Sequence, residues 1–368
     1  MTRPRVLIVS HTYTAPINRA KLGVLARHVA LTTIIPNRWS DALFDLQPDV
    51  QSPAGYTMYA LPIRFSGHIL RYVFPFRQLA RIARQVKPEI VYVEEEPASL
   101  ALAQCAYLKR HLRCRLSFFT WENVQRRVGL PGLERYNLRR CDGAIAGNTE
   151  AGDVIRSKGF RGPIRVTPQL GIDPESFRPA PSRDMRQSLG LTGFVVGFIG
   201  RLVEEKGVRV LVESVRGLSD TQLLIVGSGP LRQEIESAAR DGGIRLVDTV
   251  PHEQIASYLN ALDALVLPSQ TTPTWKEQFG HVLIEAMACG VPVIGSSSGA
   301  IPEVVGEAGL IFPEGDVAAL RAAIAGLRAS PDRRFELARA GRERVLAYYT
   351  HECIAAANAE FFTQVLHT

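Results

Sequence analysis

The stretch VVGFIGRLVEEKG, residues 195–207, decides the fold of the C-terminal half of this chain. An apolar run typical of a strand buried on both faces ends at Gly200, and a helical pattern begins after Gly207. Arg201 and Lys206 lie in the turn between them. Two cations at a strand-to-helix turn can bind a pyrophosphate, helped by backbone N–H groups at the helix N-terminus. The alternative, a surface Arg and Lys near a helix start, is less favourable because cations oppose the helix dipole there.

A second stretch, LPSQTTPTWKEQFGHVLIEAMACGVPVIGS at 267–296, carries two spaced carboxylates. Gly280 is expected to open a helix that runs to Cys289. Glu285 has apolar neighbours throughout this helix, and a buried carboxylate is costly unless something partners it. A ribose diol would satisfy both oxygens; a salt bridge to a neighbouring strand is the alternative. Glu277, in the preceding loop, could then reach a second part of the same ligand.

Strand-like runs alternate with helical patterns in both halves, which predicts an α/β fold with parallel, doubly wound sheets. The expected strands are Val6–Ser10, Ala30–Ile35, Ile90–Val93, Leu116–Phe119, Ala144–Ala146, Val195–Gly200, Leu223–Val226, Ile244–Val247, Ala264–Leu267 and Val291–Gly295. Ligands of such sheets bind outside the carboxyl ends of the strands. The functional side chains should therefore follow strands.

A length of 368 residues exceeds a comfortable single core, so two domains are expected. The polar, Pro-containing segment 171–184 is predicted to link a Rossmann-like N-terminal domain, residues 1–172, to a Rossmann-like C-terminal domain, residues 185–349. A helix at about 350–368 could pack back on the N-terminal domain.

Composition excludes several classes of protein. The chain is 46% hydrophobic, which is typical of globular proteins, and it has no apolar run long enough to span a membrane. The opening MTRPRVLIVS lacks a signal-peptide pattern, which indicates a cytoplasmic protein. Five scattered cysteines without a CxxC pair argue against zinc and against a disulfide framework.

The charge is uneven: residues 1–180 carry 26 Lys and Arg against 14 Asp and Glu. Arg77, Arg81 and Arg84 share one face of a predicted helix in FRQLARIARQVKP. One interpretation is a peripheral helix that docks on anionic lipid at the inner face of the membrane and brings the protein to a lipid-linked acceptor. The other is a core-packed helix with a solvated basic face. No nucleic-acid-binding motif accompanies the charge.

Taken together, these motifs resemble the GT-B retaining glycosyltransferases of family 4. The resemblance rests on Gly200-Arg201 with Lys206-Gly207 and on EQFGHVLIE at 277–285 followed by AMACGVPVIGS. VGSGP at 226–230, VPHEQIASYLNALDALVLPS at 250–269 and SSSGAIPEVVG at 296–306 follow the same family. It is specific over about residues 165–315. It implies two Rossmann-like domains facing a central cleft.

By resemblance, Arg201 and Lys206 would bind the donor diphosphate without a metal, and Glu285 would hold the ribose. Glu277 would bind hydroxyls of the transferred sugar. The remaining donor contacts implied are backbone groups at Gly200, Val250, Phe279 and Gly280. The donor would be a UDP- or GDP-linked sugar, with no separate cofactor.

The family resemblance implies transfer of a hexosyl-type sugar, with retention, to a glycan, a lipid-linked glycan or a small molecule. The leaving phosphate would accept the acceptor's proton. The sequence offers no evident carboxylate nucleophile for double displacement. Alternatives are another GT-B activity, such as a phosphorylase or nucleotide-sugar epimerase, and a non-catalytic sugar-nucleotide-binding partner subunit.

The N-terminal half departs from the family pattern. The loop after the first strand, SHTYTAPINRAK at 10–21, lacks the usual paired glycines, and Asn18 or Arg19 could supply polar contacts instead. In FFTWEN, Glu122 stands where many members carry a catalytic-site His. It could bind a sugar hydroxyl, face the acceptor, or be an ordinary surface Glu at a strand end. Two further groups are assigned no function. The carboxylates at 94–96 follow the strand Ile90–Val93 and point at the cleft, and at least two of them are expected in a solvated turn. His11 and His281 are expected in local packing or capping.

Overall fold

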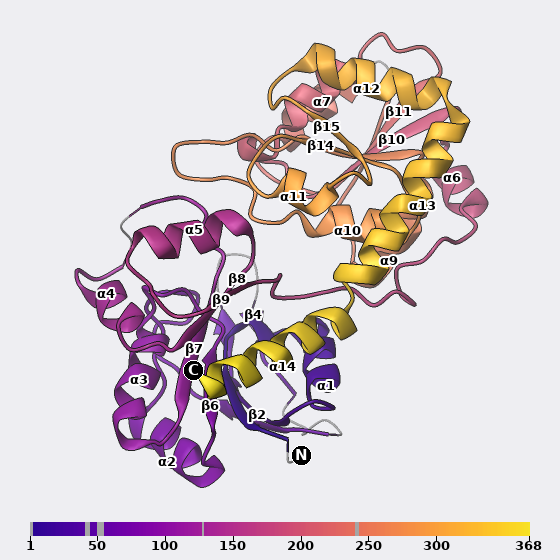
Figure 1. The fold of residues 1–368 in the computed structure, drawn as a ribbon. Helices are drawn as coiled ribbons and strands as arrows, with labels where there is room; N and C mark the ends of the chain where they lie inside the picture. Colours follow the sequence, from indigo (N-terminus) through magenta and orange to yellow (C-terminus); the bar gives the residue numbers. More distant parts are fainter. Residues whose placement is uncertain (1–2, 41–44, 50–54, 127–128, 240–242) are drawn as a thin grey trace. The chain divides into compact units, whose positions relative to one another are not determined.

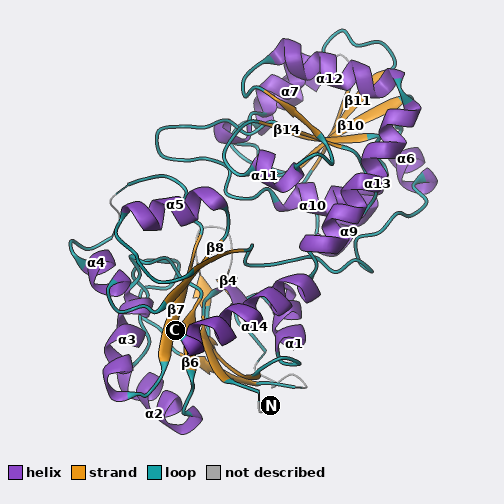
Figure 2. Cartoon of the chain, viewed as in Figure 1, coloured by secondary structure: helices purple, strands orange, loops and turns teal. Residues whose placement is uncertain are grey.

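The computed structural model describes residues 3–40, 45–49, 55–126, 129–239 and 243–368. It divides into two compact units: unit 1 comprises Met1–Gly171 with His351–Thr368, and unit 2 comprises Ile172–Thr350 (Figure 1). In each unit a parallel sheet lies between helices (Figure 2). The predicted α/β class with two parallel sheets is confirmed. Most of the segment expected to be a linker belongs to unit 2.

Unit 1 contains a seven-stranded parallel sheet in the order β5-β2-β1-β6-β7-β8-β9. Its strands are β1 (Arg5–Val9), β2 (Ala30–Pro36), β5 (Thr57–Leu61), β6 (Ile90–Val93), β7 (Arg115–Thr120), β8 (Gly143–Ala146) and β9 (Ile164–Val166). A short antiparallel pair, β3 (Trp39–Ser40) and β4 (Asp45–Leu46), lies outside it. The helices are α1 (Ala20–Leu25), α2 (Phe76–Val86), α3 (Leu100–Leu108), α4 (Leu133–Leu138), α5 (Thr149–Ser157) and α14 (His351–His367).

Strand β1 shows why unit 1 has two hydrophobic layers. Successive side chains of a strand point to opposite faces. Leu7 and Val9 accordingly pack in the core beneath α2, α3, α4 and α5. Val6 and Ile8 pack in the core on the other face, where α14 lies against α1. Burial on both faces explains the continuous apolar run in this strand.

Unit 2 contains a six-stranded parallel sheet in the order β12-β11-β10-β13-β14-β15. Its strands are β10 (Phe194–Ile199), β11 (Thr221–Val226), β12 (Ile244–Val247), β13 (Ala264–Leu267), β14 (Val293–Ser296) and β15 (Leu310–Phe312). Its helices are α6 (Arg183–Leu189), α7 (Val208–Val215), α8 (Arg232–Ala238), α9 (His252–Asn260), α10 (His281–Ala288), α11 (Ile301–Val305), α12 (Val317–Ala329) and α13 (Pro331–Tyr348). Helix α10 packs against α9, α11 and α13, whereas α7 packs against α8 and α12.

All ten predicted strands are confirmed within a few residues. The strands of the two main sheets that the sequence did not indicate, β5, β9 and β15, each lie at the edge of a sheet. An edge strand is paired on one side only and is partly exposed, so it lacks the uninterrupted apolar run of a central strand. Among the helices of the described residues, none is both long enough and apolar enough to cross a bilayer.

Candidate functional site

The carboxyl ends of β10 and β13 mark the point in unit 2 where the strand order reverses. From β10 the chain proceeds to β11 and β12 on one side, and then to β13, β14 and β15 on the other. Ligands of doubly wound sheets bind outside the carboxyl ends of the strands at such a point. Gly200 and Arg201 follow β10, and Pro268 and Ser269 follow β13. Both motifs chosen from the sequence therefore begin at the place where this fold binds ligands.

Two glycines allow the backbone of the turn after β10 to approach the backbone of neighbouring loops closely. Gly207 has a φ of +66°, and a Cβ there would lie 1.9 Å from the carbonyl oxygen of Pro268. A Cβ on Gly227, after β11, would lie 1.9 Å from the carbonyl oxygen of Gly200. Any side chain at either position would displace backbone. The close approach therefore fixes the 3-10 turn Glu204–Lys206 beside the end of β13.

Lys206 and Glu277 are direct neighbours, although 71 residues separate them. The Lys206 Nζ lies 2.5 Å from Glu277 Oε2, and the Ser269 hydroxyl donates to the same oxygen at 2.7 Å. The ammonium group also lies 5.1 Å from the centre of the Trp275 ring. Glu277 is buried and Lys206 is half-buried. A cation and a hydrogen-bond acceptor are thus held side by side at the switch point.

Arg201 is placed differently from Lys206. Its side chain is 58% exposed, and its guanidinium group lies 3.9 Å from Glu205. An exposed ion pair of this length contributes about 0–1 kcal/mol. The guanidinium group can therefore turn to an anionic ligand at small cost.

Glu285 is buried on α10, as expected, and its partner is a histidine. His252 Nε2, at the start of α9, lies 2.9 Å from Glu285 Oε1. The partner thus comes from a helix and not from a neighbouring strand. The His252 ring also packs edge-on against Phe177, with 5.3 Å between ring centroids. Val250, two residues before His252, is half-buried. The structure therefore brings two predicted donor contacts, Glu285 and Val250, close to one histidine.

The His252–Glu285 bond makes a testable contribution to stability. The hydrogen bond to Glu285 raises the pKa of His252, against a smaller opposing effect of partial burial. Because the folded-state pKa exceeds the unfolded one, the stabilisation is complete below about pH 6.5 and is lost as the pH rises through the folded-state value. We expect His252→Asn to lower the melting temperature at about pH 5.5, with a deficit that shrinks towards about pH 9.

Thermal melts over this pH range measure the effect. The control is His28→Asn, which replaces an exposed histidine of unit 1. A deficit for His252→Asn that stays constant with pH would contradict the assigned cause.

The carboxyl ends of β1 and β6 form the corresponding switch point of unit 1, and the expectation of a solvated turn there is wrong. Glu94 is 2% exposed, and its oxygens accept hydrogen bonds from Lys21 Nζ and the Tyr13 hydroxyl, each at 2.6 Å. The Lys21 side chain is fully buried. The Gln169 amide contacts Glu94 as well, at 3.1 Å.

Glu95 is also buried and orients His11. One Glu95 oxygen accepts from the His11 backbone N–H at 2.9 Å, from its Nδ1 at 2.7 Å and from the Tyr72 hydroxyl at 2.7 Å. The His11 ring lies 4.5 Å from that of Trp39. The expectation of local packing for His11 therefore omitted its ion-pair partner, 84 residues away.

Glu96 completes the row at the end of β6. It accepts hydrogen bonds from the Thr120 hydroxyl at 2.6 Å and from the Trp121 backbone N–H at 2.8 Å. Burial raises the pKa of Glu96 to about 7, although these bonds oppose the shift. The three adjacent carboxylates thus have three separate sets of partners, which come from several different elements and loops of unit 1. Sequence spacing carries no signal for such partners.

Glu122 is buried, so the interpretation as a surface residue at a strand end is wrong. It is 7% exposed, and its Oε1 accepts from Arg126 Nε at 2.8 Å. Its backbone N–H donates to the Thr120 hydroxyl at 3.1 Å. In the loop after β1, Asn18 and Arg19 donate to backbone carbonyls of that same loop. Those two side chains shape the loop that lacks glycines.

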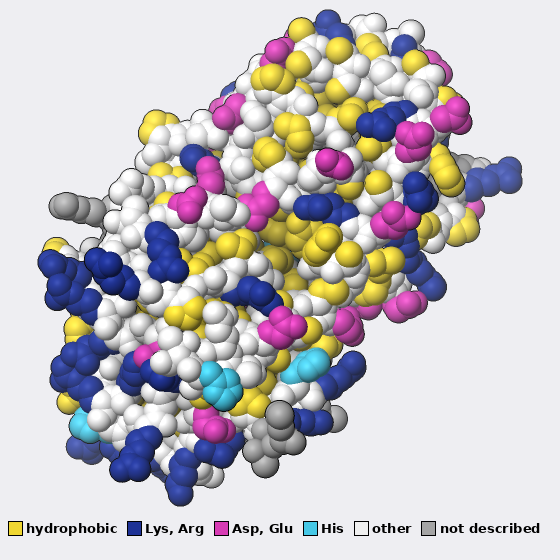
Figure 3. Space-filling model, in the orientation of Figure 1, with side chains coloured by type: hydrophobic (Ala, Val, Ile, Leu, Met, Phe, Trp, Pro, Cys, Tyr) yellow, Lys and Arg dark blue, Asp and Glu magenta, His cyan; other side chains and the backbone are white. Residues whose placement is uncertain are grey.

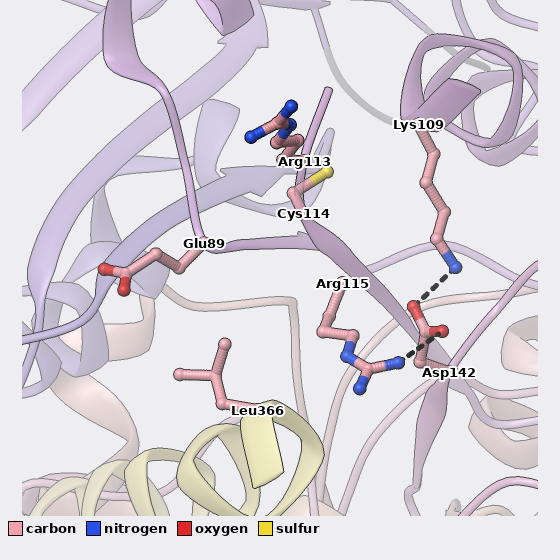
Figure 4. A pocket seen from close by; sticks show the side chains of 7 residues that line it. All are labelled: Glu89, Lys109, Arg113, Cys114, Arg115, Asp142 and Leu366. Carbon is pink, nitrogen blue, oxygen red and sulfur yellow. Dashed lines mark hydrogen bonds and ion pairs between the residues drawn. The ribbon is translucent and has the colours of Figure 1, made fainter. Parts of the chain in front are cut away.

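A cavity of about 400 Å³ lies at the opposite edge of the unit 1 sheet (Figure 4). Glu89 and Arg115 line it at the starts of β6 and β7, so it faces away from the switch point. Asp142 lies there between Lys109, at 2.6 Å, and Arg115, at 3.5 Å. None of the residues proposed from the sequence lines this cavity.

Several polar residues at the two switch points carried no recognisable signal in the sequence. They are Tyr13, Lys21, His252, Ser269 and Trp275. Across the described ranges, no group of three or more His, Cys, Asp or Glu side chains is arranged to hold a metal ion.

Three curated relatives share sequence with this chain. The 2-deoxystreptamine glucosyltransferase of Streptomyces kanamyceticus is 32% identical over 228 residues, 57% of each protein. Alpha-maltose-1-phosphate synthase of Mycolicibacterium smegmatis is 33% identical over 63% of this chain and 66% of its own length. A GDP-mannose-dependent phosphatidylinositol monomannoside mannosyltransferase of the same species is 34% identical over 52% of this chain and 54% of its own. The chain thus matches between about half and two thirds of the length of these relatives.

Solved structures agree on the fold over the whole chain. A sucrose-phosphate synthase from Thermosynechococcus elongatus superposes with a TM-score of 0.75 at 22% identity, covering 99% of both chains. Anabaena HepE, solved with UDP, superposes with a TM-score of 0.73 at 18% identity, covering 98% of this chain and all of the other. The family model described as glycosyl transferases group 1 matches residues 193–330, which include both of the motifs chosen from the sequence, 195–207 and 267–296. The chain therefore has the GT-B fold, and residues 193–330 of unit 2 form a glycosyl transferases group 1 domain.

Proposed function

We propose that this chain transfers a hexosyl-type sugar from a nucleotide-diphosphate sugar to an acceptor, with retention of anomeric configuration and without a metal ion. One observation carries the proposal. Lys206 and Glu277, from separate loops, lie 2.5 Å apart at the switch point of unit 2, with Arg201 on the adjoining turn. In this arrangement the cation can bind a phosphate group, and the carboxylate beside it can accept a hydrogen bond from a hydroxyl of the attached sugar.

Each residue proposed in unit 2 binds a different part of the donor. Arg201 and Lys206 bind the diphosphate and stabilise the charge that develops on the leaving group. Glu277 accepts hydrogen bonds from hydroxyls of the transferred sugar. Glu285 holds the ribose through the oxygen that His252 does not contact. The backbone contacts proposed for the donor are those of Gly200, Val250, Phe279 and Gly280.

The acceptor would bind at unit 1. Two of the relatives named above act on 2-deoxystreptamine and on a phosphatidylinositol monomannoside, and the third synthesises alpha-maltose-1-phosphate. For this chain we propose a glycan, a lipid-linked glycan or a small polyhydroxylated molecule. Glu122 lies at the carboxyl end of β7, where it could contact either the acceptor or the transferred sugar.

A thermal-shift screen of UDP- and GDP-linked sugars tests donor binding, because a ligand of the folded state alone raises the melting temperature. The nucleotide sugar that stabilises the protein is then assayed for hydrolysis and for transfer to candidate acceptors. We expect Arg201→Ala and Glu285→Ala to lose the shift. Full binding and activity in both variants would rule out this site.

Metal independence gives a separate prediction. The positive side chains of Arg201 and Lys206 would take the place of a divalent cation beside the leaving diphosphate. We therefore expect turnover to be unchanged when EDTA is added and when magnesium is restored. A strict requirement for added metal would show that these two side chains do not neutralise the diphosphate on their own.

We also propose a peripheral association with the inner face of an anionic membrane through α2. Arg77, Arg81 and Arg84 are all exposed, whereas the opposite face of α2 is buried in the core of unit 1. Each cation close to an anionic bilayer contributes about 1 kcal/mol. We expect reversal of all three to Glu to abolish sedimentation with vesicles that contain phosphatidylglycerol. Arg209, Arg216 and Arg339, exposed arginines of unit 2, provide a matched triple reversal that should bind as the wild type does.

A further inference from the structure

An apolar groove lies between α2 and α3 on unit 1. It has a volume of about 480 Å³ and is lined by Val73, Phe76, Leu100, Ala103, Gln104 and Tyr107. Phe76 and Tyr107 form its exposed rim, with ring centroids 5.5 Å apart, and they are 39% and 45% exposed. The two rings adjoin the apolar lining of the groove, and a contiguous exposed apolar patch is typical of an interaction site.

The wall of the groove is largely apolar, and its polar side-chain groups are the Tyr107 hydroxyl on the exposed rim and the Gln104 amide. Gln104 is the one amide side chain among the lining residues, and both ends of it are engaged. Its Nε2 donates to the carbonyl oxygen of Phe74 at 2.8 Å, and its Oε1 accepts from the Phe74 backbone N–H at 3.0 Å. The remaining lining side chains are aliphatic or aromatic. The groove therefore suits a hydrocarbon and not a sugar or a nucleotide.

Further exposed apolar side chains continue from the groove. Val73, which lines it, pairs with Arg64 at the base of a hairpin. Between these two residues, Phe65 and Ile69 are 58% and 46% exposed. The Leu100 backbone N–H donates to Leu70 at 3.0 Å, which attaches the hairpin to the start of α3.

Three arginines lie on or beside the elements that form this apolar area. The Arg110 guanidinium group lies 5.7 Å from the centre of the Tyr107 ring, on the rim. Arg77 follows Phe76 directly, and Arg71 lies on the hairpin; both are exposed. Lys and Arg side chains gather over the part of unit 1 where Figure 1 labels α2, α3 and α4 (Figure 3). An apolar surface with arginines beside it is complementary to the interface of an anionic bilayer.

We infer that this groove binds one acyl chain of an anionic phospholipid while Phe65 and Ile69 insert beside it. The inference deepens the proposed membrane association, because charge alone would hold the protein at the headgroups, whereas an occupied groove anchors it in the hydrocarbon. It identifies α2, α3 and the hairpin 64–73 as one docking surface.

Tyr107→Trp provides a direct probe of the groove. Vesicles of phosphatidylcholine with phosphatidylglycerol are compared with vesicles whose lipids carry bromine on the acyl chains. We expect bromolipids to quench the added tryptophan but not the emission that the three native tryptophans contribute in the wild type. An added tryptophan whose emission the brominated chains leave unchanged would overturn the inference.

Ala103→Phe distinguishes binding of an acyl chain inside the groove from nonspecific hydrophobic adsorption to the vesicle. The substitution fills the groove while it adds apolar area to the surface. Each buried methylene is worth about fourfold in affinity, so exclusion of two or more should weaken vesicle binding by about tenfold or more. Phe335→Gln, at a 72% exposed position of unit 2, should bind as the wild type does. Undiminished binding by Ala103→Phe would show that the groove stays empty.

Two further comparisons distinguish failure of the acyl-chain site from failure of the membrane association. Phe76→Gln changes only an exposed rim residue, and we expect it to weaken vesicle binding even if Ala103→Phe proves unstable in thermal melts. Loss of binding on reversal of Arg77, Arg81 and Arg84, with the groove variants unaffected, would leave the membrane association and overturn the acyl-chain site. A wild type that binds no vesicle would overturn both, whereas transfer to a soluble acceptor would still stand.

Discussion

Lys206→Ala is expected to lower kcat/KM for the nucleotide-sugar donor by about 100- to 1000-fold, the usual effect of removing one preorganised group that stabilises developing charge. Its ammonium group lies 2.5 Å from Glu277 at the end of β13, where the leaving diphosphate would sit. The loss should appear in kcat as well as in KM, because the charge on the diphosphate grows towards the transition state. Initial rates of transfer or hydrolysis over a range of donor concentrations measure it.

The control for Lys206 is Arg209→Ala. Arg209 is a cation three residues further along, but it is paired with Glu204 and Glu234 in solvent. We expect its loss to leave the kinetics unchanged. Lys206→Ala also removes a partner of the buried Glu277, so Lys206→Ala/Glu277→Gln is compared for stability by thermal melts. Equal rates in Lys206→Ala and in the wild type would refute the role proposed for the ammonium group.

Lys21→Ala is expected to destabilise the protein by about 3–5 kcal/mol, because it leaves a buried carboxylate without its counter-charge. The side chains of Lys21 and Glu94 are both fully buried, and their charged atoms lie 2.6 Å apart. Burial lowers the pKa of Lys21, while the interaction with Glu94 opposes that shift. Urea unfolding followed by circular dichroism, with the signals of the two units resolved where their transitions separate, measures the change.

Two comparisons isolate the buried charge as the cause. Arg38→Ala breaks the exposed pair with Asp45, and surface pairs of this kind contribute about 0–1 kcal/mol. Lys21→Met/Glu94→Gln removes both charges and should recover most of the loss. A Lys21→Ala variant as stable as Arg38→Ala would mean that Glu94 finds another partner or takes up a proton at no cost.

Much of the donor half could be predicted from the sequence, because its signals are local. The apolar run that ends at Gly200 predicts β10, and Gly280 and Cys289 bound α10 as the structure has them. The burial of Glu285 follows from its apolar neighbours within a single helix. Strand edges and special backbone positions are properties of a few consecutive residues, so a single sequence contains them.

Unit 1 shows the limit of this approach. Three consecutive carboxylates suggest a solvated turn, yet Glu94 and Glu95 are buried. Lys21 and Tyr13 compensate Glu94, and they come from the segment and helix that follow a different strand, β1. Nothing within a few residues of position 94 reveals these partners, because adjacent parallel strands bring together residues that are more than 70 positions apart.

The sequence by itself therefore determined the fold class and the central strands, and it singled out the residues of unit 2 that we propose bind a diphosphate and a sugar. The tertiary structure alone decided the pairings: Lys206 with Glu277, Glu285 with His252, and Glu94 with Lys21. The physical reason is that strand and helix signals arise from neighbours along the chain. The partner of a buried charge is set by which helices, loops and strand ends are brought together, and that depends on the folding of the whole domain.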